Sequence, residues 1–306
     1  MMRVLAVGAR FRALSPTVQG ALVATVAMML FSVVPPSVRL LSDTMSPYQI
    51  VGIRALAGIL VIGGFYMAAG SGWRLKTKRA PAHFLRATAN VAGMVLWFWA
   101  LEYVELAKGI AIHFTMPLFI TLLAVLFLGE RVGPRRVIAL LIGFAGALVI
   151  LRPGMIEIGN PELAILASAV LYAGATVFIK EMIRTETPAA VTFYTNLFMG
   201  LWCLVPTVIC WAPVTMDDAL PILGLATAGL LAPLLLATAM KFADASLIGA
   251  FDFLRLPFTA AFGFALFGEI PDEFVWAGAA VIFASTYYIT VREARRARAA
   301  HSAPPK

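Results

Sequence analysis

The sequence predicts an all-α polytopic membrane protein with ten transmembrane helices. Of the 306 residues, 61% are hydrophobic and 13% are charged, whereas soluble domains are about 45–50% apolar and about 25% charged. The apolar residues form runs of about 18–24, the helix length that crosses a hydrocarbon layer of about 30 Å. Backbone groups in lipid must bond internally, so such runs are helices rather than open sheet.

Proline marks several of the expected helix starts, because it is favoured in the first turn of a helix. The clearest cases are Ser46-Pro47, Gly133-Pro134, Asn160-Pro161 and Thr187-Pro188. The connections are short, so no soluble domain is inserted. The expected spans are 18–38, 47–69, 84–101, 107–128, 134–151, 162–180, 188–211, 219–239, 245–267 and 274–291.

The basic residues indicate how these spans are oriented. With the N-terminus placed inside, nineteen of the 24 Lys and Arg residues lie on the inner side. Those on the outer side are Arg39, Lys108 and Arg152, and those within spans are Arg54 and Arg255. This bias follows the positive-inside rule and predicts an inner-membrane protein with both termini cytoplasmic. The net charge of +8 is therefore a topology signal, and nucleic acid is not an expected partner.

The second half of the chain repeats the first at a nearly constant offset in sequence. Ser46-Pro47 corresponds to Thr187-Pro188, and Gly129-Glu130 corresponds to Gly268-Glu269. Each half has five spans, an odd number, so the halves insert in opposite orientations. The residues that follow the two Gly-Glu pairs agree, since they are basic after the first pair and acidic after the second.

This repeat defines the expected organisation of the chain. The first repeat covers 18–151 with helices one to five, and the second, inverted repeat covers 162–291 with helices six to ten. A basic cytoplasmic tail follows over 292–306. Inverted repeats are typical of carriers that alternate access around a central site. The sequence therefore predicts a secondary-type transporter.

The ordered motifs of both halves resemble those of a known family. The motifs are Ala100-Leu101-x-Tyr103, Pro117, Leu128-Gly129-Glu130-Arg131, Gly143-Phe144-Ala145-Gly146 and Leu151-Arg152-Pro153-Gly154, with weaker copies at Pro257, Gly268-Glu269 and Trp276-Ala277-Gly278. Over roughly residues 20–291 the chain resembles EamA-domain transporters of the drug/metabolite transporter superfamily, bacterial ten-span type. The resemblance implies a cavity lined mainly by the first, third, fourth, sixth, eighth and ninth helices. Members carry amino acids, S-adenosylmethionine, nucleotide sugars or drugs.

Polar residues deep in a span are costly and are therefore functional candidates. In the ninth span, Asp252 and Arg255 lie three residues apart on one face, about 12 and 16 Å from the inner boundary. Arg255 is expected to bind an anionic group of the substrate, and Asp252 a cationic group or a proton; the alternative is an ion pair that only packs the bundle. Pro257 follows and frees a backbone carbonyl.

Other candidates lie on helices that line the expected cavity. His113, four residues before Pro117, either binds substrate or a proton or bonds a neighbouring carbonyl. Asn90, Trp97 and Tyr172 are expected to line the cavity, with lipid or packing contacts as the alternative for the two aromatic residues.

Two further features concern the periphery and the gating of the bundle. Pro35 and Pro36 cannot continue an undisturbed helix, so a kink is expected there. Together with Pro117 and Pro257 they are candidates for gating positions. Arg54 lies about 10 Å deep in the second span, where a long side chain can snorkel toward water, so a structural role is favoured.

The substrate expected from these residues is a small amphipathic metabolite, most simply an amino acid, moved by export or facilitated exchange. S-adenosylmethionine, a drug or another metabolite is the alternative. A membrane-embedded enzyme is disfavoured because the chain has none of the usual catalytic motifs, while a non-transporting membrane subunit stays open. No cofactor, metal or ATPase subunit is indicated. The expected partners are the small-molecule substrate and the lipid bilayer, and the protein is expected to be a monomer or weak dimer.

Overall fold

The protein is an all-α membrane protein, as the sequence predicts. The computed structural model describes residues 14–128, 134–152, 158–182, 185–242 and 251–301. Within these ranges every regular element is a helix. Expected features outside them are the basic residues between Arg3 and Arg12, the Gly129-Glu130 pair, the 243–250 segment that opens the ninth span and residues 302–306 of the tail.

Several helices begin where proline predicts. They are α4 (Pro47–Ala68), α8 (Pro134–Leu151) and α10 (Pro188–Ile209). The hydroxyl oxygens of Ser46 and Thr187 accept the backbone N–H groups three residues later. These two bonds satisfy donors that an uncapped helix would leave unpaired.

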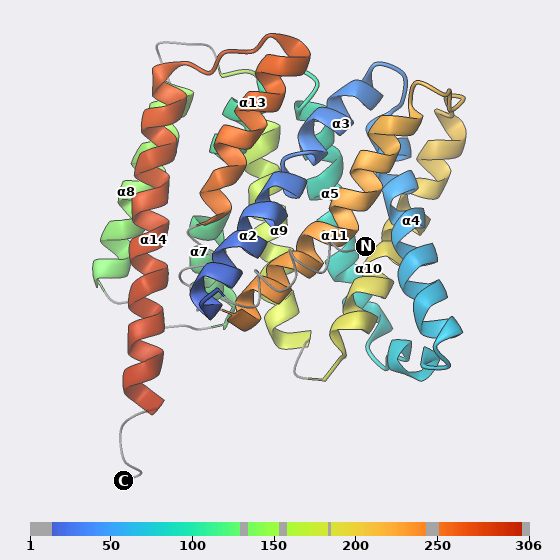
Figure 1. The fold of residues 1–306 in the computed structure, drawn as a ribbon, viewed down its shortest axis with the longest axis horizontal. Coiled ribbons are helices and arrows are strands. Elements are labelled where there is room, and N and C mark those ends of the chain that lie inside the picture. The colour runs from blue at the N-terminus through green and yellow to red at the C-terminus, as the bar shows by residue number, and fades with distance from the viewer. Residues whose placement is uncertain (1–13, 129–133, 153–157, 183–184, 243–250, 302–306) are drawn as a thin grey trace.

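The remaining unbroken helices are α5 (Ala80–Ala100), α9 (Asn160–Met182), α11 (Ala219–Phe242) and α14 (Glu273–His301), with a short 3-10 helix, η1 (Gly72–Leu75). Helix α14 continues ten residues beyond the expected span 274–291, so the first part of the expected tail is helical. This segment contains no Gly or Pro and is rich in Ala and Arg, which favour helix. In Figure 1 the C-terminal part of α14 extends below the other helices.

Three of the expected spans are divided rather than continuous. The first consists of α2 (Pro16–Phe31) and α3 (Val34–Ser42), and the fourth of α6 (Leu106–His113) and α7 (Met116–Leu128). The described part of the ninth is a 3-10 turn, η2 (Asp252–Leu254), followed by α13 (Arg255–Phe267).

Proline explains where the second segment of each divided span begins. Pro35 and Pro36 lie in the first turn of α3, Pro117 in that of α7 and Pro257 in that of α13. A first-turn proline needs no N–H donor, whereas further inside a helix its ring would clash with the preceding turn.

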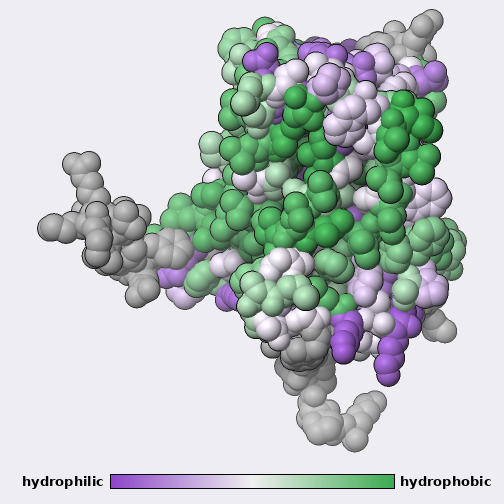
Figure 2. Space-filling view, turned by 90° about the vertical axis from the view of Figure 1, so that its right-hand side faces the viewer, coloured by the Kyte–Doolittle hydropathy of each residue, from purple (hydrophilic) through white to green (hydrophobic). Residues whose placement is uncertain are grey.

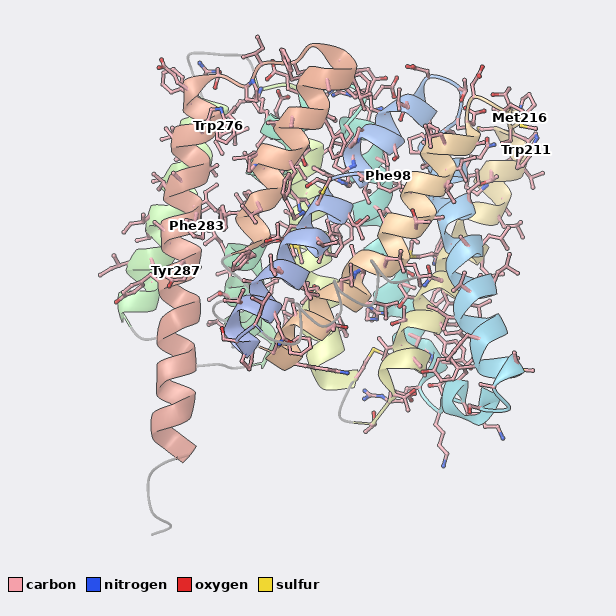
Figure 3. All side chains as sticks on the ribbon, in the orientation of Figure 1. Phe98, Trp211, Met216, Trp276, Phe283 and Tyr287 are labelled. Carbon is pink, nitrogen blue, oxygen red and sulfur yellow. The ribbon has the colours of Figure 1, made fainter. Side chains whose placement is uncertain are left out.

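The surface has the band of apolar residues that a bilayer requires. Figure 2 shows this hydrophobic band, with hydrophilic residues gathered above and below it. In Figure 3, Trp211 and Trp276 lie toward the upper end of the bundle, as aromatic residues do at a membrane interface. Among the described residues, six helical stretches are long and apolar enough to cross a membrane, and two shorter apolar helices lie at Val137–Leu151 and Glu273–Ser285. The count of ten spans stays a prediction.

The helices pack in pairs that join the two halves of the chain. Helix α5 packs on α9, α2 on α11, α4 on α10 and α8 on α14. Gly146 and Gly278 let α8 and α14 approach closely, because a Cβ on Gly278 would lie 2.6 Å from the Gly146 carbonyl oxygen. The three divided spans also pack on one another: α13 contacts α6, α2 and α3.

Candidate functional site

The interruptions of the three divided spans meet in the middle of the bundle. The Ser32 hydroxyl, at the break between α2 and α3, lies 3.2 Å from the Arg255 carbonyl oxygen at the start of α13. The ring of Phe114, at the break between α6 and α7, lies 4.6 Å from that of Phe253 in η2. From here α13 rises for thirteen residues, about 20 Å, to its end, so this junction lies deep inside a hydrocarbon layer of about 30 Å.

Three of the predicted residues form a cluster of rings next to this junction. The His113 ring is 4.7 Å from the Trp97 ring and 5.6 Å from the Tyr172 ring. They come from α6, α5 and α9. Gly93 favours the close approach of α9 to α5, because a Cβ at Gly93 would lie 3.2 Å from Cβ of Leu171 and 3.3 Å from the Ser168 carbonyl oxygen. The packing of α5 on α9 therefore brings Tyr172 to the ring cluster.

The predicted pair of charges borders the same region. Arg255 Nη1 lies 3.5 Å from Asp252 Oδ1, and the Asp252 side chain is 42% exposed despite its depth in the bundle. The Arg255 guanidinium lies over the Phe31 ring, 5.3 Å from its centroid. It is also within electrostatic range of His113 and of the Tyr172 hydroxyl. The pair is thus long and partly accessible, rather than a tight buried ion pair.

For the other predicted residues, the structure shows no contact among the described residues that indicates a role in binding. Asn90 lies one turn before Met94 on α5 and is half-buried. Within the part of the chain that the structure describes, its side chain makes no recorded hydrogen bond. Four prolines begin the second segments of the divided spans, as described above, and their role in gating stays a prediction.

Some residues of the junction were not predicted. Phe114 and Phe253 are separated by the same interval as Gly129-Glu130 and Gly268-Glu269, so the repeat itself was a signal that could have found them. Phe253 in turn contacts Phe283 of α14, with centroids 3.9 Å apart; Figure 3 labels this side chain. Arg54 was expected to snorkel toward water. Instead its Nη1 lies 3.4 Å from the Met94 sulfur, inside the bundle.

Above the junction, one arginine ties the divided spans together. Nε of Arg39, near the end of α3, donates to the Leu101 carbonyl oxygen at 2.7 Å. Its Nη2 donates to the Val104 carbonyl oxygen, and its Nη1 pairs with Glu269 after α13. The other Glu269 oxygen accepts the Leu106 N–H at 2.8 Å. This network, the upper tie, joins α3, the start of α6 and the end of α13.

Left-handed backbone at Gly268 returns the chain so that Glu269 can take part in the upper tie. Gly268 has φ of +69° and follows the last residue of α13, a conformation that glycine adopts without a steric penalty. Two more ion pairs lie at the same end of the bundle: Lys108 Nζ is 2.8 Å from Glu162 Oε1, and Arg152 pairs with Asp272.

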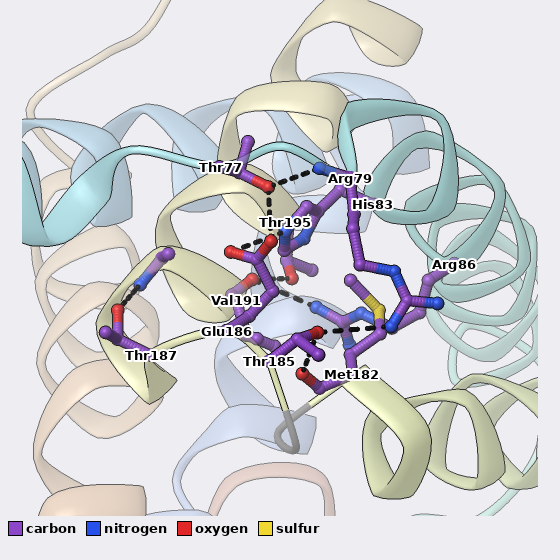
Figure 4. Close-up of polar contacts among 11 residues, drawn as sticks. Thr77, Arg79, His83, Arg86, Met182, Thr185, Glu186, Thr187, Val191 and Thr195 are labelled. Atoms are coloured by element: carbon purple, nitrogen blue, oxygen red, sulfur yellow. Dashed lines mark hydrogen bonds and ion pairs between the residues drawn. The ribbon is translucent and has the colours of Figure 1, made fainter.

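A second polar cluster lies at the opposite end, between the beginnings of α5 and α10 (Figure 4). Glu186 Oε1 accepts the Thr77 hydroxyl at 2.8 Å, and Glu186 Oε2 lies 3.7 Å from Nε2 of the buried His83. Arg86 is buried and donates from Nη2 to the Val191 carbonyl oxygen at 3.1 Å. These contacts fasten α5 to α10 away from the central junction.

The central arrangement is suited to binding rather than to catalysis. Rings stack with planar groups, guanidinium groups donate hydrogen bonds in a planar fork, and a carboxylate accepts them. No group of three or more His, Cys, Asp or Glu side chains that could hold a metal ion lies among the described residues.

Comparison with known proteins gives a consistent result. The EamA-like transporter family matches residues 18–152 and 160–291. The chain is 33% identical to the riboflavin transporter of Vibrio cholerae serotype O1 over 78% of this chain and 81% of that protein. It is 26% identical to the S-adenosylmethionine uptake transporter of Rickettsia bellii, over 83% and 87%. A solved crystal structure with 18% identity has a TM-score of 0.63, covering 90% of this chain and 98% of that one, and shows the fold alone.

Replacing Glu269 with Gln should destabilise the protein by about 3 kcal/mol, because it leaves the Arg39 guanidinium without a counter-ion where both side chains are only 14% exposed. Asp272→Asn is the matched control. The Asp272 side chain is 41% exposed, so losing its charge should cost at most about 1 kcal/mol. Its Oδ1 accepts the Val275 N–H, and the amide oxygen of Asn preserves this cap. Unfolding in detergent measures the stability of both variants. Equal losses of unfolding free energy would show that the upper tie contributes no more than the exposed Arg152–Asp272 pair.

Proposed function

This chain belongs to the EamA-like transporter family, and we propose that it carries a planar heteroaromatic metabolite across the membrane, with riboflavin as the first candidate. The family and the transporter relatives place the chain among membrane transporters of the drug/metabolite superfamily, not among enzymes. The observation that carries the substrate proposal is the ring cluster of Trp97, His113 and Tyr172 beside a guanidinium and a carboxylate.

The chemistry of a flavin corresponds to the groups in this site. Its fused ring offers a flat apolar face, which aromatic side chains stack against favourably. One edge of the ring carries two carbonyl acceptors and an N–H donor. Arg255 supplies donors and Asp252 an acceptor for such an edge. The similarity to the Vibrio cholerae riboflavin transporter, 33% over most of both chains, supports the same assignment.

An amino acid, the substrate expected from the sequence, and S-adenosylmethionine remain the competing substrates. The pair of Asp252 and Arg255 would suit the ammonium and carboxylate groups that both carry. An amino acid without an aromatic side chain, however, has no planar ring that could stack on this cluster. The proposal therefore favours a larger planar ring.

Alternating access by two inverted repeats is the proposed mechanism. It is supported by the nearly constant sequence offset between the halves and by the helix pairs. The repeat makes α5 equivalent to α11 and α9 equivalent to α2, so the α5–α9 pair corresponds to the α11–α2 pair. In the α4–α10 and α8–α14 pairs, each helix packs on its own equivalent from the other half. Divided helices at a central site are a recurrent feature of such carriers. The protein would act as a monomer or weak dimer without an ATPase subunit.

The proposed orientation places both termini in the cytoplasm of a bacterial cell, with the upper tie facing outward. It rests on the nineteen basic residues assigned to the inner side. A reporter that is active only in the cytoplasm should be active when fused after Lys306. Activity of a periplasmic reporter at that position would contradict the orientation.

Reconstituted vesicles test the substrate. Vesicles containing the protein should exchange riboflavin, followed by its own fluorescence, faster than empty vesicles do. Excess unlabelled phenylalanine or S-adenosylmethionine should leave the rate unchanged. Flux of either competitor without flux of riboflavin would reject the flavin assignment while leaving the transporter assignment in place.

Arg255→Met should lower riboflavin flux by about tenfold or more, because a charge-assisted hydrogen bond to the substrate is lost. The accessible Asp252 side chain implies that stability changes by less than about 1 kcal/mol. Combining Arg255→Met with Asp252→Leu should then give a folded protein that is still inactive. If the double variant recovers transport, the two residues form only a structural pair.

A further inference from the structure

Arg54 is a charged side chain for which the structure shows no counter-ion. It lies in α4, seven residues after Pro47, or about 10 Å along the helix. Among the described residues, no carboxylate lies within ion-pair distance of its guanidinium. Its one recorded hydrogen bond is to the thioether of Met94, which is a weak acceptor. A cation at this depth is costly unless another group accepts its hydrogen bonds.

The guanidinium is directed into the bundle rather than toward water at its end. It lies against Met94 of α5 and against Gly229 of α11, where a Cβ would be 3.0 Å from Arg54 Nε. It is also within electrostatic range of the Tyr172 hydroxyl of α9, which Arg255 reaches as well. Arg54 therefore borders the central site through Met94, which lies one turn from Trp97 on α5, and through Tyr172.

The space beside Arg54 remains accessible. The residue is half-buried. The Nε atoms of Arg86 and Arg255 are fully buried and make no hydrogen bond, but no nitrogen of Arg54 is in this situation. A snorkelling arginine would place its charge at the end of the bundle. Here the guanidinium lies against Met94 and Gly229 inside the bundle instead.

We infer that Arg54 is a specificity-determining residue that binds the acceptor-bearing edge of the substrate. This inference rests on the proposed function and deepens it. Asp252 already faces Arg255, so these two charges offset each other and Arg54 leaves the site with an excess of one positive charge. The planar fork of a guanidinium matches two adjacent acceptors on one planar edge, as in the O4 and N5 atoms of a flavin.

The excess charge also selects against cations. S-adenosylmethionine carries a sulfonium, an ammonium and a carboxylate, and so a net positive charge, which Arg54 repels. The substrates expected for this site are therefore neutral or anionic ring systems with paired hydrogen-bond acceptors. The second helix, which the family resemblance leaves outside the cavity, thereby contributes a substrate contact.

Binding to the purified full-length chain in detergent tests the inference, with riboflavin and lumichrome as fluorescent probes. Lumichrome has the same O4 and N5 acceptors but no ribityl chain. Arg54→Met should weaken binding of both probes by about tenfold or more. Arg54→Lys keeps the charge but not the fork, so it should give an intermediate loss. Gly229→Ala crowds Nε and should weaken both probes by a smaller factor.

Arg86→Met is the matched control, because it removes a buried arginine from the cluster at the other end of the bundle. It should leave both affinities within about twofold of the parent, since it touches no central residue. Unfolding in detergent identifies any variant that fails to fold. If Arg54→Met does not fold, the affinity of Arg54→Lys for the two probes tests the inference instead.

The outcomes separate the two proposals. If the parent protein binds flavins and a folded Arg54→Met variant binds them equally well, the role of Arg54 is wrong and the proposed function stands. Loss of riboflavin binding with unchanged lumichrome binding overturns the contact with the ring edge. If the parent binds S-adenosylmethionine and no flavin, the proposed function fails, and with it the selection against cations.

Discussion

The central constraint on this fold is that backbone groups inside a bilayer need partners within the protein. Three divided spans break this continuity, and their interruptions are tolerable because they face one another instead of lipid. Ser32 contacts the backbone of Arg255, and Phe114 packs on Phe253. The polar site therefore lies where the breaks meet, because only there is irregular backbone shielded by the other helices.

Charge is distributed according to the same constraint. At the upper end, Arg39 is paired with Glu269 and with two backbone carbonyl groups, so its burial is compensated. In the centre, the one hydrogen bond of the Arg54 side chain among the described residues is to a thioether, and Arg255 has a carboxylate at 3.5 Å. Compensated charges hold helices in place, whereas charges with spare hydrogen-bonding capacity are those that a ligand can use.

The repeat has kept a framework while its chemistry has diverged. The sequence offset that relates Phe114 to Phe253 also relates His113 to Asp252. The two phenylalanines contact each other, but the histidine lies among rings and the aspartate faces an arginine. A site with unlike sides can bind a substrate with one apolar face and one polar edge, although both halves match the same family.

Local chemistry was enough to determine the class of the protein from its sequence. The length of each apolar run, the basic residues beside it and the prolines at helix starts act within a few residues, so the all-α membrane fold and the starts of α4, α8 and α10 were predictable. The prolines also marked the divided spans. Only the tertiary structure decided which residues meet across them, because Arg54, Met94 and Gly229 come from three helices far apart in sequence. The inward direction of Arg54 depends on the space that Gly229 leaves, and such packing between helices has no local signal.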